Sequence, residues 1–550
     1  MNAHRSARVK RGIGLAVITV GLALTATACP WTKAARPDQG GTLTVAAWEP
    51  NCADPLLPCS TGNWGGADPT MTLQTVPRVV DSRNGHYVPS VLLAGAPNLD
   101  PGPPQRVTYH INSKAVWSDG QPITSSDFRF TWSAIVHEKD VLDPTGYNQI
   151  QSIDDSDPRT AVVTFSTPYA DWRDLFGEYY GVLPKHLLEG RDRHALMKDG
   201  YRWSGGPWLI QSWTKGRSIV LIPNRRFWGE RPKLDRVVFT FVTDDSSEEQ
   251  AYRSGQAQVI APAGWTTRTD LRALPDTNFA ITPSLNYEEL TFNTERPPLD
   301  DKAVRQALAY ATDRAAIARA VFTLEPQSAP IDSFLSPANP FYVDPFRRYQ
   351  RNLQKVDQIM GADGWAQGPD GIWTRQGRRA TLQFTAVDQD PIGRAEIEGN
   401  LLQTQWRQAG FDVTTRPTAA DVLFGDLVPN GKFSTVSYKD LPLTFSPSDC
   451  WQWCSQNIPP AGQAWSRLHS PTVDDLFHKI ATELDDARRQ TLVAQAQQAL
   501  ADEVPGLPLA APPTIIYWRT TVGGPIGAND PFGPFMNLNQ WYCKGGRCST

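Results

Sequence analysis

The chain has 550 residues, of which 40% are hydrophobic and 20% charged, a balance typical of a globular protein with an ample core. The 53 Lys and Arg against 57 Asp and Glu give a net charge of −4, which excludes nucleic-acid binding driven by phosphate contacts. The length predicts roughly three or four domain-sized units, and the 46 Pro predict many turns and long surface connections.

The first 28 residues are typical of an export signal. Four basic residues lie among the first eleven, residues 12–26 carry no charge, and small residues precede Cys29. The uncharged run is shorter than the ~20 residues that a membrane-spanning helix needs. An uncleaved anchor helix is the alternative. Removal of the signal leaves 49 basic against 57 acidic residues, so the exported chain carries a net charge of −8.

The other six cysteines come in three close pairs, as expected of an exported protein. Three local disulfides are the simplest connectivity, and each would fix the shape of a short loop. No C-x-x-C spacing occurs, so the sequence predicts no zinc site. The predicted bridges are Cys52–Cys59, Cys450–Cys454 and Cys543–Cys548.

The exported chain begins with a connector and a strand. Residues 30–40 contain two prolines and a glycine, which predicts a tether. In the following stretch, GTLTVAAW at 41–48, Leu43 and Val45 alternate with threonines, a pattern typical of a strand.

Residues 106–135 predict a strand, a turn and a helix. Apolar residues alternate from 107 to 111, and Asp119 begins a predicted turn. Thr124 and Asp127 form a capping box at the start of the helix. We therefore expect both acids to serve as turn and cap residues rather than as catalytic groups.

Two further strands are predicted at 219–221 and 237–241, joined by a turn over 224–232. Arg225, Arg226, Lys233 and Arg236 cluster around this turn, which we interpret as a solvated face. His186 stands two residues after a proline at a predicted helix start, and we expect it to pack or cap rather than to bind a ligand.

Residues 287–322 predict a strand, a rigid turn and one long helix. Tyr287, Glu289 and Thr291 share one strand face, and the apolar Leu290 and Phe292 on the other face predict a half-buried strand. Two prolines end it, an aspartate offers the helix N-cap, and apolar residues from 304 to 322 recur at steps of three and four.

The later chain alternates helices and strands. Strands are expected at 381–386 and 411–415, and a helix at 397–409. A glycine-ended helix and hairpin fit 353–374, and apolar stripes predict two helices over 473–484 and 492–500.

Three stretches carry a specific resemblance: Trp-Ser-Asp-Gly-x-Pro-x-Thr-x-x-Asp at 117–127, the block at 205–241, and FNTERPPLDDKAVRQALAYATDRAAI at 292–317. Together they resemble the extracytoplasmic solute-binding proteins of peptide and nickel ABC importers, the dipeptide- and oligopeptide-binding family. The end of the signal likewise resembles a lipobox, which implies acylation of Cys29, although Ala26 stands where that motif prefers Leu.

The resemblance implies an α/β fold of the large two-lobed periplasmic-binding-protein type II, with an extra subdomain in the first lobe. The chain would cross twice between the lobes and form a hinge. The implied limits are 1–28 for the signal, 29–40 for the tether, 41–80, 205–290 and 515–550 for lobe I, 81–204 for the subdomain, and 291–514 for lobe III.

Enzyme and cofactor motifs do not stand out. No G-x-S-x-G, H-E-x-x-H or G-x-x-x-x-G-K-[ST] pattern occurs, and the eight His are scattered. We therefore predict a binding protein that is not an enzyme, with no cofactor and no metal site. A carboxylate pair of a hydrolase can be identified only by geometry, so an anchored hydrolase stays the alternative from another class.

The resemblance implies that an acid after Gly431 grips the amino terminus of a peptide, but this chain departs from the pattern there. Relatives have Phe-Asp and then a Trp, whereas this chain has Phe433-Ser434 and a later tyrosine. Asp440 or Asp449 is the candidate replacement. The full set of candidate ligand-binding residues is Trp48, Trp265, Asn286, Tyr287, Tyr438, Asp440, Trp451 and Trp453.

The predicted function is capture of di- or oligopeptides outside the cell and delivery to an ABC permease by hinge closure. The partners would be the ligand, the permease and, through the lipid anchor, the outer face of the cell membrane; we expect a monomer. The alternatives are a non-peptide solute, such as a metal chelate or glycoside, and presentation of ligand to a signalling receptor.

Overall fold

The computed structural model describes residues 38–550, except for 51–52, 57–70, 84–85, 139–140, 142–143, 178–179, 263–268, 322–329, 388–393, 441, 443–444, 528–532 and 550. The described residues belong to one compact unit, which begins at Pro37. The predicted signal, Cys29, the Cys52–Cys59 bridge and Trp265 therefore lie outside the described residues.

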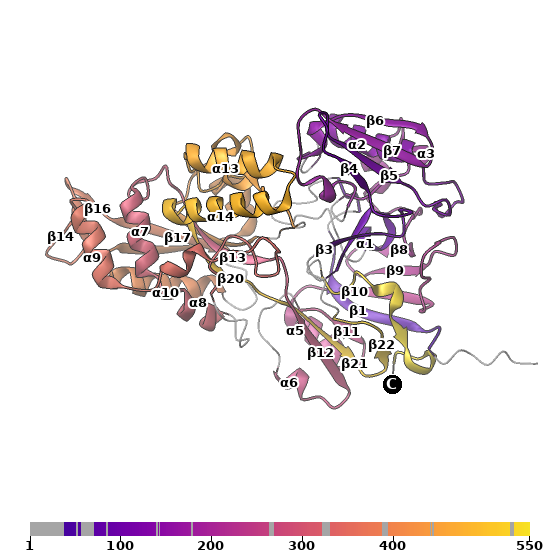
Figure 1. The fold of residues 1–550 in the computed structure, drawn as a ribbon. Coiled ribbons are helices and arrows are strands. Elements are labelled where there is room, and N and C mark those ends of the chain that lie inside the picture. The colour runs from indigo at the N-terminus through magenta and orange to yellow at the C-terminus, as the bar shows by residue number, and fades with distance from the viewer. Residues whose placement is uncertain are drawn as a thin grey trace, which may run out of the picture. The chain divides into compact units, whose positions relative to one another are not determined.

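A seven-stranded mixed sheet draws on three parts of the chain (Figure 1). β1 pairs in parallel with β10 and β11, whereas β10 and β9, β9 and β8, and β21 with both neighbours pair antiparallel. α5 (Asp245–Arg253) packs beside β1, as the polar outer face of that helix allows. In sheet order the strands are β12 (Thr277–Thr282), β21 (Thr514–Arg519), β11 (Val259–Ile260), β1 (Thr42–Trp48), β10 (Arg236–Val242), β9 (Ser218–Pro223) and β8 (Trp208–Thr214).

A four-stranded antiparallel sheet forms from the segment between β1 and β8. Its order is β4 (Asn98–Asp100), β5 (Arg106–His110), β7 (Thr160–Phe165) and β6 (Ile150–Asp157). α2 (Ser125–His137) packs on β6 and β7, and the predicted capping box of Thr124 and Asp127 is confirmed at its start. His186, in α3 (Lys185–Leu188), places Nε2 2.7 Å from Oδ2 of Asp119 in the predicted turn.

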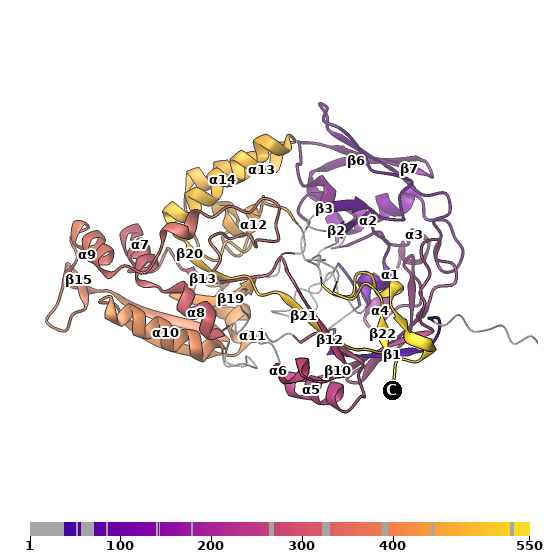
Figure 2. The same ribbon diagram turned by 60° about the horizontal axis from the view of Figure 1, so that its bottom comes forward.

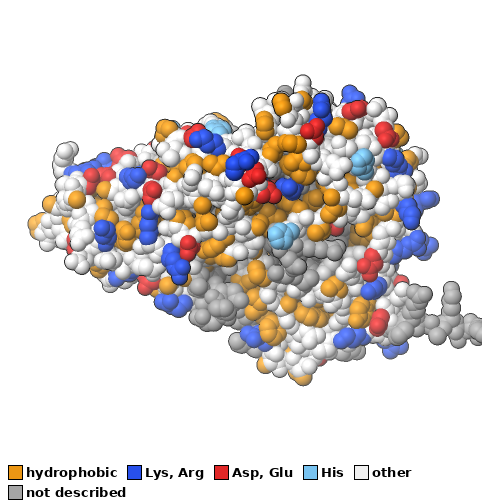
Figure 3. Space-filling view, viewed as in Figure 1, with side chains coloured by type: hydrophobic (Ala, Val, Ile, Leu, Met, Phe, Trp, Pro, Cys, Tyr) orange, Lys and Arg blue, Asp and Glu red, His pale blue; other side chains and the backbone are white. Residues whose placement is uncertain are grey.

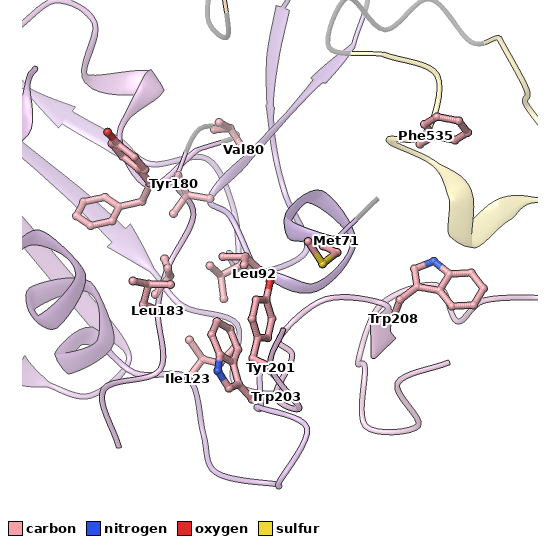
Figure 4. Close-up of a cluster of buried hydrophobic side chains, with 14 of the residues drawn as sticks. Met71, Val80, Leu92, Ile123, Tyr180, Leu183, Tyr201, Trp203, Trp208 and Phe535 are labelled. Carbon is pink, nitrogen blue, oxygen red and sulfur yellow. The ribbon is translucent and has the colours of Figure 1, made fainter. Parts of the chain in front are cut away.

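One hydrophobic core joins these two sheets. Figure 4 shows part of it, where side chains from residues 71–92 and 180–203 lie with Trp208 of β8 and Phe535 near the C-terminus. The rings of Tyr201 and Trp203 stack with centroids 4.3 Å apart. Because the core is continuous, the inserted segment is packed against the first sheet.

A five-stranded sheet forms from the segment between β12 and β21. In this sheet β13 pairs antiparallel with β19 and β20, while β17 and β18 pair in parallel with each other. Its own core is built from the strands and the helices around them. In order the strands are β18 (Asp412–Thr418), β17 (Thr381–Val387), β19 (Thr435–Asp440), β13 (Tyr287–Phe292) and β20 (Gly506–Ala510).

Several helices accompany this second sheet, and α13 and α14 lie side by side (Figures 1 and 2). Ser470 and Asp485 cap them through hydrogen bonds to backbone N–H groups. The helices are α7 (Lys302–Ala311), α8 (Arg314–Val321), α9 (Leu353–Ala362), α10 (Arg394–Gln408), α11 (Ala420–Val422), α12 (Cys450–Trp453), α13 (Pro471–Thr482) and α14 (Asp486–Glu503).

The smaller elements complete the chain. They are α1 (Thr72–Thr75), α4 (Arg193–Met197), α6 (Thr269–Arg272), β2 (Val80–Arg83), β3 (His86–Pro89), β14 (Ala366–Gln367), β15 (Trp373–Arg375), β16 (Arg378–Arg379), β22 (Val522–Gly523), β23 (Tyr542–Cys543), the 3₁₀ turns Tyr147–Gln149, Trp172–Asp174, Pro345–Arg348, Ser455–Asn457, Leu538–Gln540 and Lys544–Gly546, and the π turn Leu423–Leu427. Among the described helices, none combines the length and apolar character needed to cross a membrane.

Two connections, 283–286 and 511–513, lead between the first sheet and the second (Figure 2). The sequence division places residues up to 290 in the first lobe, but β13 pairs wholly within the second sheet. The chain therefore changes sheets before Tyr287.

The prediction of one long helix over the stretch to residue 322 is wrong. The structure has α7 and α8 instead, because Thr312 takes an extended conformation with φ −90° and ψ 120°. Asp313 then accepts a hydrogen bond from the N–H of Ala316 at 2.8 Å and caps the second helix. The prediction of a half-buried β13 is also wrong, since all six of its residues are buried.

Candidate functional site

The candidate site lies against one face of β13. In an antiparallel pair, directly opposed residues share a face of the sheet, and the register sets Tyr287 opposite Asp440 and Glu289 opposite Tyr438. This face therefore gathers two tyrosines and two acids. We call it the site face.

A small pocket opens beside these residues. It encloses about 30 Å³, enough for one or two groups of the size of a water molecule. Trp453 and Phe334 form one wall, with ring centroids 4.5 Å apart. The lining residues are Leu285, Tyr287, Phe334, Leu335, Ser336, Asn339, Asp440, Pro442, Ser446, Pro447, Asp449, Gln452, Trp453, Phe477 and Gln497.

Glu289 lies directly behind this pocket and is only 1% exposed. Its Oε1 accepts hydrogen bonds from the hydroxyls of Thr291, at 2.7 Å, and of Tyr438. Its Oε2 lies 3.5 Å from Nε2 of Gln452, whose Oε1 in turn accepts from the hydroxyl of Tyr287 at 3.4 Å. A hydrogen-bonded chain thus connects the buried acid to the pocket wall.

Burial raises the pKa of Glu289 to about 8, and the negative charges of Asp440 and Asp449 act in the same direction. The hydrogen bonds from Tyr438 and Thr291 oppose this shift. Burial likewise raises the pKa of the Tyr287 hydroxyl well above its usual value, with the charge of Asp440 as the next cause. Both tyrosines therefore act as neutral donors at this site.

The pocket is electrostatically one-sided. Asp440 and Asp449 line it, while the described lining residues include no Lys, Arg or His. Glu289 behind it is mainly protonated at neutral pH, because its pKa is raised to about 8, and so adds little charge. Such a site favours a compact cationic group, because no basic side chain of the described lining offsets the negative charge of Asp440 and Asp449.

The Cys450–Cys454 disulfide shapes the rim of the pocket. Both this bridge and Cys543–Cys548 are formed in the structure, as predicted. Asp449 caps α12 by accepting a hydrogen bond from the N–H of Gln452 at 3.1 Å. The short helix thus fixes Asp449 and Gln452 on the same side of the pocket.

The opposite face of β13 carries a different acid. Glu288 is fully buried and ion-paired with Arg394 at the start of α10. The hydroxyl of Ser437 donates its one proton mainly to Oε2 of Glu398, at 2.6 Å, with Oε1 of Glu288 as the weaker, shared acceptor at 3.3 Å. We call this the core face, because Phe292 beside these groups packs on Trp406, with ring centroids 6.3 Å apart.

The structure brings together part of the predicted ligand-binding set. Tyr287, Asp440 and Trp453 line the pocket and Tyr438 adjoins it. Asp449, the other candidate acid, lines it as well.

Three predicted residues lie elsewhere. Trp48 ends β1 in the first sheet and is 44% exposed, and neither Asn286 nor Trp451 is among the lining residues. The sequence pattern did not indicate Glu289, Gln452 and Asn339 as site residues. The signal for Glu289 was present, since two successive acids in an otherwise apolar strand place one on each face.

Comparisons with known proteins agree with this architecture. The profile of the bacterial extracellular solute-binding proteins, family 5, middle region, matches residues 103–457. The chain belongs to this family. Members are solute-binding proteins of ABC importers that act outside the cytoplasm, and they are binding proteins rather than enzymes.

This family 5 protein has curated and structural relatives. The oligopeptide-binding protein OppA of Mycobacterium tuberculosis (strain ATCC 25618 / H37Rv) is 27% identical over 432 residues, which cover 76% of this chain and 71% of OppA. The periplasmic EDTA-binding protein EppA superposes with a TM-score of 0.81 at 22% identity, covering 92% of this chain and 97% of EppA.

A third similar structure is the oligopeptide-binding protein AppA of Bacillus subtilis in complex with a nonapeptide. The TM-score is 0.75 at 19% identity, and the superposition covers 92% of this chain and 100% of the AppA chain. These similarities show that the chain has the predicted two-lobed α/β fold of the family.

Proposed function

We propose that this family 5 protein captures peptides outside the membrane and holds their protonated amino end in the acidic pocket of the site face. The observation that carries the proposal is the charge of that pocket: Asp440 and Asp449 line it, and the described lining includes no basic side chain. A peptide ammonium is a compact cation with three donors, which matches carboxylate and amide oxygens.

The size of the pocket fits this role. A space of about 30 Å³ accommodates one terminal group and not a whole ligand. The remainder of a peptide would extend from the pocket across solvent-accessible surface, where backbone hydrogen bonds give affinity for many sequences. Asp440 and Asp449 would then both bind the peptide amino terminus, a role that the resemblance assigns to a single acid.

The similarity to OppA, in which 432 residues align at 27% identity, supports a peptide ligand. The similarity to EppA, an EDTA-binding protein by name, supports the alternative of a metal chelate. Chelates of that kind carry several carboxylates, so their charge opposes an acidic pocket without basic residues. The pocket therefore favours the peptide over the chelate.

Delivery completes the proposed function. Cleavage before Cys29 and acylation of its thiol would tether the protein to the outer face of the membrane, with residues 29–40 as the spacer. Ligand contacts made across the two lobes would favour a closed form, with connections 283–286 and 511–513 acting as the hinge. A permease would recognise that closed form and receive the peptide unchanged.

Identification of the ligand that co-purifies with the protein tests the proposal. The exported chain is purified without denaturation, unfolded in acid, and the released small molecules are analysed by mass spectrometry. We expect peptides of several residues with free amino ends. A metal chelate, a glycoside or a chemically cleaved product as the main species would contradict the proposal.

A further inference from the structure

The loop 445–449 contacts two neighbours. Ser446, Pro447 and Asp449 line the acidic pocket. The other two residues of the loop, Phe445 and Ser448, contact the segment inserted between β1 and β8. One short loop thus touches both the pocket and a distant part of the chain.

The first of these contacts is made by Phe445. Its backbone N–H donates to the hydroxyl of Tyr87 at 3.1 Å, and the two rings meet edge to face with centroids 5.2 Å apart. The Tyr87 hydroxyl also donates to the carboxylate of Asp174. This contact fixes the start of the loop against β3.

The second contact is made by Ser448, whose hydroxyl donates to Oδ2 of Asp171. Oδ1 of the same aspartate is ion-paired with Arg489 in the first turn of α14. Asp171 and Arg489 are each only 4% exposed. The backbone N–H of Ala170 donates to the carbonyl of Ala481 at 2.8 Å, so the contact also reaches the end of α13.

Because this ion pair is buried, its stability depends on the hydrogen bonds that it receives from neighbouring groups. A buried charge is tolerated when its hydrogen-bonding capacity is met, and loss of one partner leaves a desolvation penalty. Arg489 donates to one carboxylate oxygen of Asp171, and its Nε donates to the carbonyl of Ile480 at 3.1 Å. The hydroxyl of Ser448 donates to the other oxygen, so the loop is hydrogen-bonded to a buried, ion-paired carboxylate.

We infer that Asp171 and Ser448 are positioning residues for ligand capture: through the loop 445–449 they hold Asp449 at the acidic pocket. The inference rests on the proposed function for the identity of the captured group, but the mechanical link does not. It makes the pocket sensitive to the contact between the inserted segment and the α13–α14 hairpin. A ligand that fills the pocket would in turn stabilise that contact.

The mechanical link is tested first, in the exported chain without added ligand. Ser448→Ala removes the hydroxyl and keeps the Asp171–Arg489 pair. Hydrogen–deuterium exchange of the peptide covering 445–450 should accelerate about tenfold, as expected for loss of a hydrogen bond to a charged group. The matched control is Ser455→Ala, which removes a similar serine–aspartate bond, to Asp474, away from the inserted segment. Equal exchange in S448A and wild type would overturn the inference.

Ligand selectivity is tested second, by calorimetry with tetra-alanine and its N-acetylated form. S448A should weaken binding of the free-amine peptide about tenfold and leave the acetylated peptide unchanged, since only the former needs Asp449 in place. The double variant S448A/D171N should bind the free-amine peptide no more weakly than D171N alone, because both changes break the same hydrogen bond between Ser448 and Asp171. Additive losses, or equal losses for both peptides, would overturn the positioning role.

The two tests separate the possible failures. If wild-type protein binds neither peptide, the proposed function fails, and the exchange experiment alone decides whether the loop is anchored as inferred. If wild type prefers the free amine but S448A behaves like wild type, the function stands and the inference fails.

Discussion

Glu288 and Glu289 are neighbours on β13, and both are buried, yet their surroundings differ. Glu288 on the core face is ion-paired with Arg394 and hydrogen-bonded to Ser437. Among the described residues, the donors to Glu289 on the site face are the neutral groups of Thr291, Tyr438 and Gln452, and Asp440 and Asp449 lie nearby. The strand alternation places one acid in each environment.

The difference separates an acid that holds the fold together from one that belongs to the site. A carboxylate with a buried cation stays charged, and its loss or the loss of its partner is costly. A carboxyl group without such a partner keeps its proton, as the raised pKa of Glu289 indicates. Groups of the second kind cluster at functional sites. On this basis we assign the ligand to the site face.

The largest effect should come from breaking the ion pair of the core face. Arg394→Met leaves Glu288 and Glu398 buried without their guanidinium. We expect the free energy of unfolding at pH 7 to fall by about 3–5 kcal/mol, the usual cost of unpairing a buried charge. Urea denaturation followed by tryptophan fluorescence measures it.

The control for this variant is Arg407→Met, an exposed arginine at the other end of α10. Its substitution removes a hydrogen bond to the backbone carbonyl of Val413. Apart from the cost of that bond, the free energy of unfolding should change by no more than about 0.5 kcal/mol. Similar losses for both variants would show that the core-face pair has no special role.

The second effect concerns Glu289→Gln and depends on pH. The pKa of Glu289 in the folded protein, about 8, is above its ordinary value of 4.5, so the folded protein binds a proton that the unfolded chain releases between these values. Its stabilising contribution is full below pH 4.5 and is lost as the pH rises toward 8. Relative to E289Q, wild type should lose on the order of 3 kcal/mol between pH 5 and pH 8.

Urea denaturation of both proteins at several pH values measures this difference. The expected result is a stability difference that grows in favour of E289Q as the pH rises. A difference that is constant with pH would mean that Glu289 is already ionised, and the contrast with Glu288 would disappear.

The third effect is on ligand affinity. Asp449→Asn keeps the shape of the side chain and an acceptor for the N–H of Gln452 but removes the charge at the pocket. Binding of tetra-alanine should weaken about tenfold, the value of one charge-assisted hydrogen bond. Calorimetry measures it, and unchanged affinity would remove Asp449 from the site. Asp440→Asn should act in the same direction.

The smallest effect is expected for Thr291→Val, which removes one hydroxyl that donates to Glu289. Because that bond stabilises the ionised form, the pKa of Glu289 should rise further, by about one unit. NMR titration with carboxyl-labelled glutamate measures it, with Thr385→Val on β17, which β19 separates from β13, as the matched control. A lower pKa in T291V would contradict the described network.

Much of the fold was predictable because its signals are local. The capping box of Thr124 and Asp127, the strand β1 and the bridge Cys450–Cys454 each depend on residues a few positions apart. The break between α7 and α8 also had a local signal, since Asp313 is a favoured cap. The apolar spacing continued through it, so the pattern predicted one helix where there are two.

The site was less predictable because its contacts are distant in sequence. Tyr438, which donates to Glu289, is 149 positions away, and Asp171 is 318 positions from Arg489. Strand alternation placed Glu289 beside Tyr287, but only the register of β13 with β19 shows which residues oppose them. A buried acid is recognised by what surrounds it, and that is a property of the folded chain.

The central claim, that an acidic pocket grips a ligand by its ammonium group, is tested most directly by removing that charge from the ligand. Calorimetry compares tetra-alanine with its N-acetylated form on the wild-type protein at pH 7. The account predicts that acetylation weakens binding by at least about tenfold, since the cationic group that would bond to Asp440 and Asp449 is lost. Equal affinity for the two peptides would contradict it.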